Sequence, residues 1–175
     1  YLRCGAIARF SNVMASVIDF ANAGGKVLGV CNGFQILCES HLLPGVLLRN
    51  KDQKFICKNI HLRTETGNTI LTGRLNEGDV LKIPIAHAEG RFHASDETLQ
   101  ELIANDQILF KYCDENGNIN EDSNFNGALH NIAGICNSGR NVFGMMPHPE
   151  RAAEDILGNS DGLRILEGLM AGVGV

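Results

Sequence analysis

The sequence predicts an α/β fold built as a single domain, and two observations carry this prediction. Residues 27–30 (VLGV) form a short, uninterrupted apolar run, which is typical of a parallel strand covered on both faces. One helical pattern precedes this run and another follows it directly. With 175 residues, the chain also has the length of one domain whose core is large enough to fold without disulfide bonds.

The composition excludes several classes of protein. The net charge is −5 at pH 7, so no large cationic surface is available for nucleic acid or an anionic membrane. Apolar residues make up 44% of the chain and charged residues 20%, as in globular proteins. No apolar run reaches the roughly 18 residues of a membrane span. The six cysteines include no C-x-x-C pair, so we expect reduced thiols in a cytoplasmic protein and no metal site.

The first elements in chain order are a helix, the strand at 26–30 and a second helix. Ser11 is suited to cap a helix that ends at Gly24 and Gly25. The 3.6-residue period gives this helix one apolar face, comprising Val13, Met14, Val17, Ile18 and Ala21. After the strand, residues 33–39 predict the next helix.

Residues 44–85 differ in character, because short strand patterns alternate there with turn residues. The strand candidates are residues 55–62 and 80–85. Turn signals lie between them at residues 67–68 and 76–79. We predict a small antiparallel insertion on the main sheet.

The second half of the chain predicts two helices and three strands. Ser95 is suited to cap a helix with an apolar side made of Leu99, Leu102 and Ile103. The strand candidates are 107–113, 132–136 and 142–146, the last two forming a hairpin. The Asn-rich residues 116–126 predict a solvated loop. The final helix, at 161–170, is expected to place three apolar residues on one side, namely Leu163, Leu166 and Met170.

The strongest chemical motif is the G-x-C-x-G of residues 29–33, directly after the buried strand and before a helix. This is the context of a nucleophile elbow, in which a strained turn exposes a side chain at the top of the sheet. The N-terminus of the following helix favours a thiolate at Cys31 and can bind an oxyanion. Taken alone, the pattern fits an inert buried cysteine equally well.

A second motif, residues 145–151 (MMPHPER), lies just past the last strand. Two prolines stiffen the backbone around His148 beyond the end of the sheet, where α/β folds bind ligands. His148 and Glu150 share a face in extended backbone, so the carboxylate can bond one ring nitrogen while the other meets a thiol. Together with the elbow, this spacing predicts a nucleophilic site of Cys31, His148 and Glu150.

The remaining cysteines and histidines carry weaker signals. Five cysteines, namely Cys4, Cys38, Cys57, Cys113 and Cys136, are interpreted as small core residues. His87 and His93 show no metal-ligand spacing, and the residues alone favour solvated or interface histidines.

At these motifs the chain resembles the class I, triad-type glutamine amidotransferases. Within them it resembles the glutaminase subunits of phosphoribosylformylglycinamidine synthase, on VLGVCNGFQIL (27–37), PIAHAEG (84–90), NIAGICN (131–137) and GMMPHPER (144–151). The resemblance covers nearly the whole chain and implies one glutaminase domain over residues 1–175. Its implied fold is a flavodoxin-like three-layer sandwich with a mixed, mostly parallel central sheet and a small antiparallel insertion.

The resemblance also implies a mechanism. Cys31 would attack the carboxamide of glutamine, with His148 as acid and base and Glu150 holding His148. The backbone N–H of Asn32 would donate to the oxyanion, and Gln35, Ala86 and His87 would line the glutamine pocket. Ammonia would pass to a large ATP-dependent synthetase subunit, accompanied by a small accessory subunit. ATP and magnesium would bind that synthetase, and this subunit would carry no cofactor.

In the family, an opening strand-helix-strand unit and a Gly-rich loop with a second oxyanion donor precede the position of Leu2. Because the sequence starts at Tyr1, we expect a domain without that unit and with little or no activity. Two other functions stay open at this point. One is a non-catalytic scaffold of the same fold, and the other is a cysteine hydrolase of the α/β-hydrolase type, whose acid normally precedes its histidine.

Overall fold

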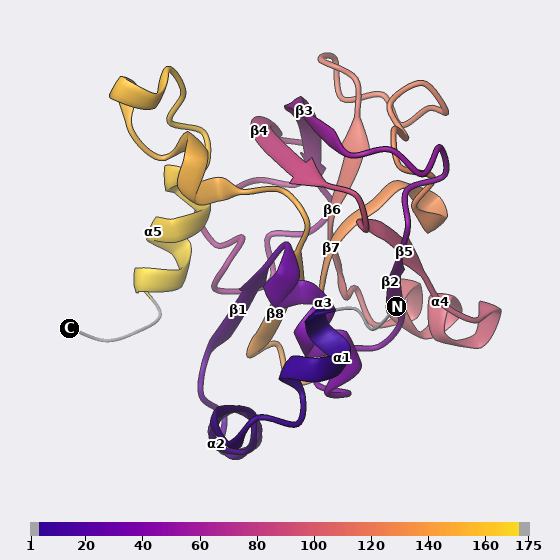
Figure 1. The fold of residues 1–175 in the computed structure, drawn as a ribbon. Helices are drawn as coiled ribbons and strands as arrows, with labels where there is room; N and C mark the ends of the chain where they lie inside the picture. The colour runs from indigo at the N-terminus through magenta and orange to yellow at the C-terminus, as the bar shows by residue number, and fades with distance from the viewer. Residues whose placement is uncertain (1–3, 172–175) are drawn as a thin grey trace.

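The architecture is an α/β fold around one mixed sheet (Figure 1). It is given by a computed structural model that describes residues 4–171. Within that range six strands form a sheet in the order β1-β8-β7-β6-β3-β4. Their bounds are β1 Val27–Val30, β3 Ile56–Thr64, β4 Val80–His87, β6 Ile108–Cys113, β7 Ile132–Cys136 and β8 Val142–Met145.

The strands pair in both senses, so the prediction of a mixed sheet is confirmed. β1 lies parallel to β8, with Val27 opposite Val142 and Val30 opposite Met145. The expectation of a mostly parallel sheet is wrong for the described residues, where the other neighbouring pairs of this sheet are antiparallel. For β7 and β8 the reason is local, because the hairpin turn that joins them is too short for the crossover that parallel strands need.

Two helices precede β1 in the described chain. α1 (Cys4–Ala8) contacts α3 (Asn32–Glu39), and α2 (Asn12–Asn22) begins at Ser11, whose side chain accepts from the backbone N–H of Met14 at 3.4 Å. The predicted cap is therefore confirmed. Of the apolar face predicted for this helix, Met14 and Ala21 are buried, but Val13 is 70% exposed.

The region 44–85 departs from the predicted insertion. β3 pairs with the whole of β4 through residues 56–63 and also pairs with β6, so both strands continue the main sheet. The small separate element is a two-stranded antiparallel sheet of β2 (Val46–Leu48) and β5 (Arg91–His93). The pairing of the C-terminal half of β3 with β6 joins the β3–β4 hairpin directly to the main sheet, so the hairpin is not a separate insertion.

Two later helices differ in how well their buried faces were predicted. α4 (Asp96–Ala104) is capped by Ser95 as expected and buries Leu99 and Leu102, while Ile103 is half-exposed. α5 (Leu163–Ala171) buries Ile165 and Gly168 in place of the predicted face, whose Met170 is 69% exposed. A Cβ on Gly168 would lie 2.5 Å from the carbonyl oxygen of Ile70, so the glycine permits a close backbone contact that hydrophobic periodicity does not reveal.

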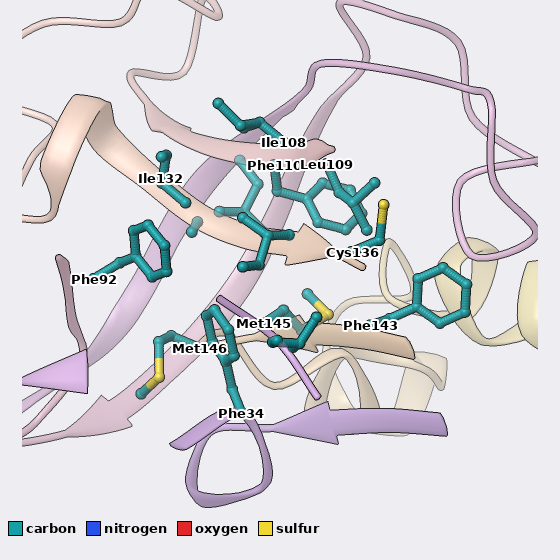
Figure 2. Close-up of a cluster of buried hydrophobic side chains, with 14 of the residues drawn as sticks. Phe34, Phe92, Ile108, Leu109, Phe110, Ile132, Cys136, Phe143, Met145 and Met146 are labelled. Atoms are coloured by element: carbon teal, nitrogen blue, oxygen red, sulfur yellow. The ribbon is translucent and has the colours of Figure 1, made fainter. Parts of the chain in front are cut away.

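Figure 2 shows part of the core, in which buried side chains from β6, β7 and β8 gather with Phe34 and Phe92. Phe34 of α3 stacks on Phe92 with ring centroids 6.0 Å apart, and both rings are fully buried. Gly144 of β8 lets α3 approach, because a Cβ there would lie 2.1 Å from the Phe34 ring. This contact fixes the height of α3, and hence of its first residues, above β1 and β8. None of the helices in the described part of the chain has the length and hydropathy needed to span a bilayer.

Candidate active site

The turn between β1 and α3 holds Cys31 in a strained conformation. Its φ is +53° and its ψ is −105°, a region that a side chain with a Cβ rarely occupies and that recurs at functional sites. The backbone is fixed on both sides, since Cys31 N–H donates to Met145 O at 2.8 Å and Cys31 O accepts from Gln35 N–H at 3.2 Å. The predicted elbow geometry is therefore present.

The two glycines of the motif serve different needs. A Cβ on Gly29 would lie 2.6 Å from the Gly33 carbonyl carbon, so the close return of the helix over the strand requires glycine at position 29. A Cβ on Gly33 would meet no described atom within 4 Å. Only the first glycine is explained by packing in the described residues.

His148 and Glu150 form the closest ionisable pair at this end of the sheet. His148 Nδ1 lies 2.6 Å from Glu150 Oε1, and His148 N–H donates to Pro84 O of β4 at 2.8 Å. The predicted contact is present, but the backbone is not extended: residues Pro149–Ala152 form a 3₁₀ helix that begins with a proline. The turn brings the carboxylate back toward the ring, which leaves His148 buried and Glu150 half-exposed.

A pocket of about 420 Å³ brings the other predicted site residues together. Its lining includes Cys31, Asn32, Gln35, Ala86, His87 and His148. Glu150 does not line it and contacts His148 instead. The Cys31 thiol faces Ala86 O at 3.9 Å. Residues from three separate stretches of sequence thus surround one cavity at the end of β1, as the family resemblance implied.

The first turn of α3 supplies two groups to this pocket. Asn32 is the first residue of the helix, where backbone N–H groups have no acceptor within the helix. Gln35 is buried and its Nε2 donates to Glu89 O at 2.6 Å. Since a backbone carbonyl can only accept, Gln35 Oε1 is the free end of the amide, and it has no partner among the described residues.

His87 is only 3% exposed, so the interpretation of a solvated histidine is wrong. Its Nδ1 lies 3.1 Å from Asn50 Oδ1, and its Nε2 has no hydrogen-bond partner in the part of the chain that the structure describes. Burial, reinforced by the charge of His148, lowers the pKa of His87 from 6.5 to about 4. His93, in contrast, is exposed.

Several pocket residues were not found from the sequence. Arg49, Phe55, Glu89 and Arg151 also line the cavity, with Arg49 Nε 3.7 Å from Glu89 Oε1. Arg49 and Phe55 lie before β3, outside every motif quoted above. Glu89 and Arg151 lie within quoted motifs, but no pattern assigned them to the pocket.

The Asn-rich residues 116–126 are not the fully solvated loop that was predicted. Asn126 is 1% exposed and its Nδ2 donates to Gly90 O at 2.8 Å, which ties this segment to the wall of the pocket. Asn131 is buried too, and its Nδ2 donates to Tyr112 O at 3.1 Å. A count of asparagines gives no signal for this role, because the same residue type favours exposed turns.

The other cysteines are mostly core residues, as expected. Burial raises the pKa of the Cys113 and Cys136 thiols to about 11 and that of Cys38 further still. Cys57 is exposed, which corrects its assignment to the core, and the side chain of Cys4 lies outside the described residues. Residues 5–171 contain no group of three or more His, Cys, Asp or Glu side chains arranged to hold a metal ion.

Known proteins are similar to this chain in sequence and in fold. Residues 4–161 match the model of the CobB/CobQ-like glutamine amidotransferase domain. The phosphoribosylformylglycinamidine synthase subunit PurQ of Sulfurimonas denitrificans is 56% identical over 97% of this chain and 75% of its own length. The subunit of the same name from Chlorobaculum parvum is 54% identical over 98% of this chain and 68% of its own length.

A solved structure agrees with these relatives. A chain in the structure of PurLQS from Thermotoga maritima superposes with a TM-score of 0.85 at 36% identity, covering 99% of this chain and 74% of that one. A putative GMP synthase subunit from Thermoplasma acidophilum, at 14% identity and a TM-score of 0.55, shares the fold. On these matches, the chain belongs to the CobB/CobQ-like glutamine amidotransferase family, within its group of phosphoribosylformylglycinamidine synthase subunits.

Proposed function

We propose that this chain is the glutaminase component of phosphoribosylformylglycinamidine synthase and releases ammonia from glutamine by way of a Cys31 thioester. One observation carries the proposal: a cysteine on a strained strand-to-helix turn shares a pocket with a histidine whose far nitrogen is held by a carboxylate at 2.6 Å. Nucleophile, base and orienting acid are the three parts that such catalysis requires.

The first half-reaction forms the thioester. The Cys31 thiol gives its proton to His148 Nε2, and Glu150 stabilises the imidazolium through Nδ1. The sulfur then attacks the carboxamide carbon, and the negative charge that develops on oxygen is placed near the N-terminus of α3, where the Asn32 N–H can donate. His148 Nε2–H protonates the leaving nitrogen, the C–N bond breaks and ammonia departs.

The second half-reaction restores the enzyme. His148, again neutral, takes a proton from water, and the hydroxide adds to the thioester carbon. The C–S bond then breaks, glutamate is released and the sulfur recovers a proton from His148. Gln35 Oε1 and His87 supply acceptors in the pocket for donors of the substrate.

The ammonia released from glutamine is used by another subunit. The chain delivers it to a large synthetase subunit that uses ATP and magnesium, in an assembly completed by a small accessory subunit. The protein names of the relatives and the PurLQS structure from Thermotoga maritima support this assignment. This subunit needs no cofactor for the steps above, because its own residues supply nucleophile and base. Free thiols at Cys38, Cys57, Cys113 and Cys136 support a cytoplasmic location.

Cys31→Ala in the full-length protein, assembled with its synthetase, tests the proposal. We expect glutamine-dependent synthesis to fall by at least ~10³-fold, while synthesis from added ammonia is unchanged. An electrophilic glutamine analogue should label wild type once, on Cys31, and excess glutamine should block the label. Cys57→Ala is the matched control, since its thiol is exposed outside the pocket lining. Full glutamine-dependent activity in Cys31→Ala would instead support the non-catalytic scaffold.

A further inference from the structure

Asn50 is a buried amide whose orientation is fixed by its partners. It is 1% exposed, and its Nδ2 donates to Lys54 O at 2.8 Å and to His87 O at 2.9 Å. Its Oδ1 accepts from Gly90 N–H at 3.1 Å. Backbone carbonyls only accept and backbone N–H groups only donate, so the oxygen and nitrogen of this amide cannot be exchanged.

The orientation of Asn50 determines which nitrogen of His87 carries the proton. Because Asn50 Oδ1 can only accept, His87 Nδ1, at 3.1 Å from it, must donate. The lone pair of the neutral ring is then on Nε2. Burial and the charge of His148 hold the pKa of His87 at about 4, so the neutral form prevails at pH 7.

That lone pair is buried in the pocket without a partner. His87 lines the same cavity as Cys31 and His148, and Nε2 makes no hydrogen bond within residues 4–171. Gly90 packs against the ring so closely that a Cβ there would lie 2.3 Å from it, which restricts the ring to this position. An unsatisfied buried acceptor is costly, and a ligand that brings an N–H donor removes the cost.

Glutamine carries donors on its α-ammonium and on its carboxamide, and the position of His148 favours the carboxamide. His148 must reach the carboxamide nitrogen to protonate it as ammonia leaves. His148 and His87 line the same pocket, and the backbone N–H of His148 donates to Pro84 O of β4, the strand that ends in His87. A carboxamide nitrogen that meets the His148 ring therefore lies in the pocket that the His87 ring lines.

We propose that His87 Nε2 accepts a hydrogen bond from the carboxamide N–H of the substrate, and that Asn50 is the positioning residue that keeps this acceptor available. The two histidines then have separate roles: His148 carries the proton, and His87 orients the leaving nitrogen and selects an amide over an ester. This inference rests on the proposed glutaminase function.

The decisive comparison is His87→Phe assayed with glutamine and with the γ-methyl ester of glutamate, whose leaving group has no N–H. Phenylalanine keeps a planar aromatic ring at this position and removes the lone pair of Nε2, while Gly90 N–H still donates to Asn50 Oδ1. We expect kcat/KM for glutamine to fall about 10- to 100-fold and kcat/KM for the ester to change less than about threefold. His93→Phe, on the exposed neighbour in β5, should leave both values unchanged. Equal losses for amide and ester in His87→Phe would overturn the proposal.

Asn50→Asp tests the positioning role in a variant that retains the His87 side chain. A carboxylate beside Nδ1 favours the imidazolium, which turns Nε2 from an acceptor into a donor. We expect kcat/KM for glutamine to gain a new limb that rises about tenfold with pH, and the ester to show no such limb. Adding His87→Phe to Asn50→Asp should abolish the limb. A pH profile identical to wild type, in protein whose thermal unfolding shows it is folded, would refute the role of Asn50.

Failure of the proposed glutaminase function and failure of the proposed His87 role would give different experimental results. If wild-type protein with its synthetase does not hydrolyse glutamine, the proposed function fails and no amide-to-ester ratio exists to measure. If it hydrolyses glutamine and the ratio is the same in wild type and His87→Phe, only the role of His87 fails.

Discussion

Two buried histidines share the candidate site, and they differ in the group that holds Nδ1. In the turn after β8, His148 Nδ1 meets the carboxylate of Glu150 at 2.6 Å. At the end of β4, His87 Nδ1 meets the neutral amide of Asn50 at 3.1 Å. Both rings leave Nε2 without a protein partner in the described structure. The same side chain is therefore placed in two electrostatic settings within one pocket.

The contrast explains how one pocket can contain a proton carrier and a fixed acceptor. A carboxylate on Nδ1 stabilises the imidazolium, so a proton can reside on His148 during the reaction. An amide orients the ring without supplying charge, and burial then keeps His87 neutral.

The largest effect is expected from Glu150→Gln, which gives His148 the kind of partner that His87 has. The amide can still accept from Nδ1–H, but it provides no charge for the imidazolium. We expect kcat for glutamine hydrolysis to fall about 10³-fold, equivalent to about 4 kcal/mol in the barrier. The measurement is steady-state glutaminase activity of the assembled full-length enzyme, with ammonia-dependent synthesis as the internal reference.

Arg151→Gln is the control for that ion pair, read on kcat alone because Arg151 also lines the pocket and can affect KM. Arg151 Nε lies 3.7 Å from Glu150 Oε1, and both side chains are about half-exposed, so this ion pair contributes little. Its removal should change kcat less than about threefold. If Arg151→Gln and Glu150→Gln caused equal losses, the salt bridge rather than the histidine contact would be the relevant interaction.

The next effect is a dependence of stability on pH that belongs to His87. Its pKa of about 4 in the folded protein lies below the ordinary histidine value of 6.5, so the unfolded chain takes up this proton first as the pH falls. The stability associated with the neutral ring is complete above pH 6.5, is lost as the pH falls toward 4 and then levels off. The loss between pH 7 and pH 4 amounts to about 3 kcal/mol.

Urea denaturation of wild type and His87→Phe at both pH values isolates this contribution. Carboxylates titrate in both proteins, so the difference between them reports the histidine. We expect wild type to lose about 3 kcal/mol more than the variant on acidification. Equal losses in the two proteins would mean that folding does not lower the pKa of His87.

The two histidine regions also differ in what the sequence could predict. The turn at His148 is local: a strand, two prolines and an H-x-E spacing predicted its contact, and only the 3₁₀ geometry was missed. The setting of His87 is nonlocal, because Asn50 is 37 residues away along the chain. No periodicity or motif links the two positions, and the residues alone favoured a solvated histidine.

The fold shows the same division between local and nonlocal features. The caps at Ser11 and Ser95 and the β7–β8 hairpin were predicted, since each depends on a few neighbouring residues. The place of β3 in the main sheet and the buried face of α5 were not. Both depend on backbone contacts with distant segments, such as Gly168 against the carbonyls of Ile70 and Leu71.

The smallest effect is expected from Asn126→Ala, which removes a contact to the loop after His87 and leaves the His148 turn intact. Asn126 Nδ2 donates to Gly90 O at 2.8 Å, and its Oδ1 accepts from Ala128 N–H at 3.0 Å. Truncation leaves both backbone groups buried without these partners, so we expect a loss of about 2 kcal/mol in the free energy of unfolding by urea. Asn116→Ala, at an exposed position of the same segment, should change it by less than about 0.5 kcal/mol. If both variants were equally stable, Asn126 would not stabilise the loop that follows His87.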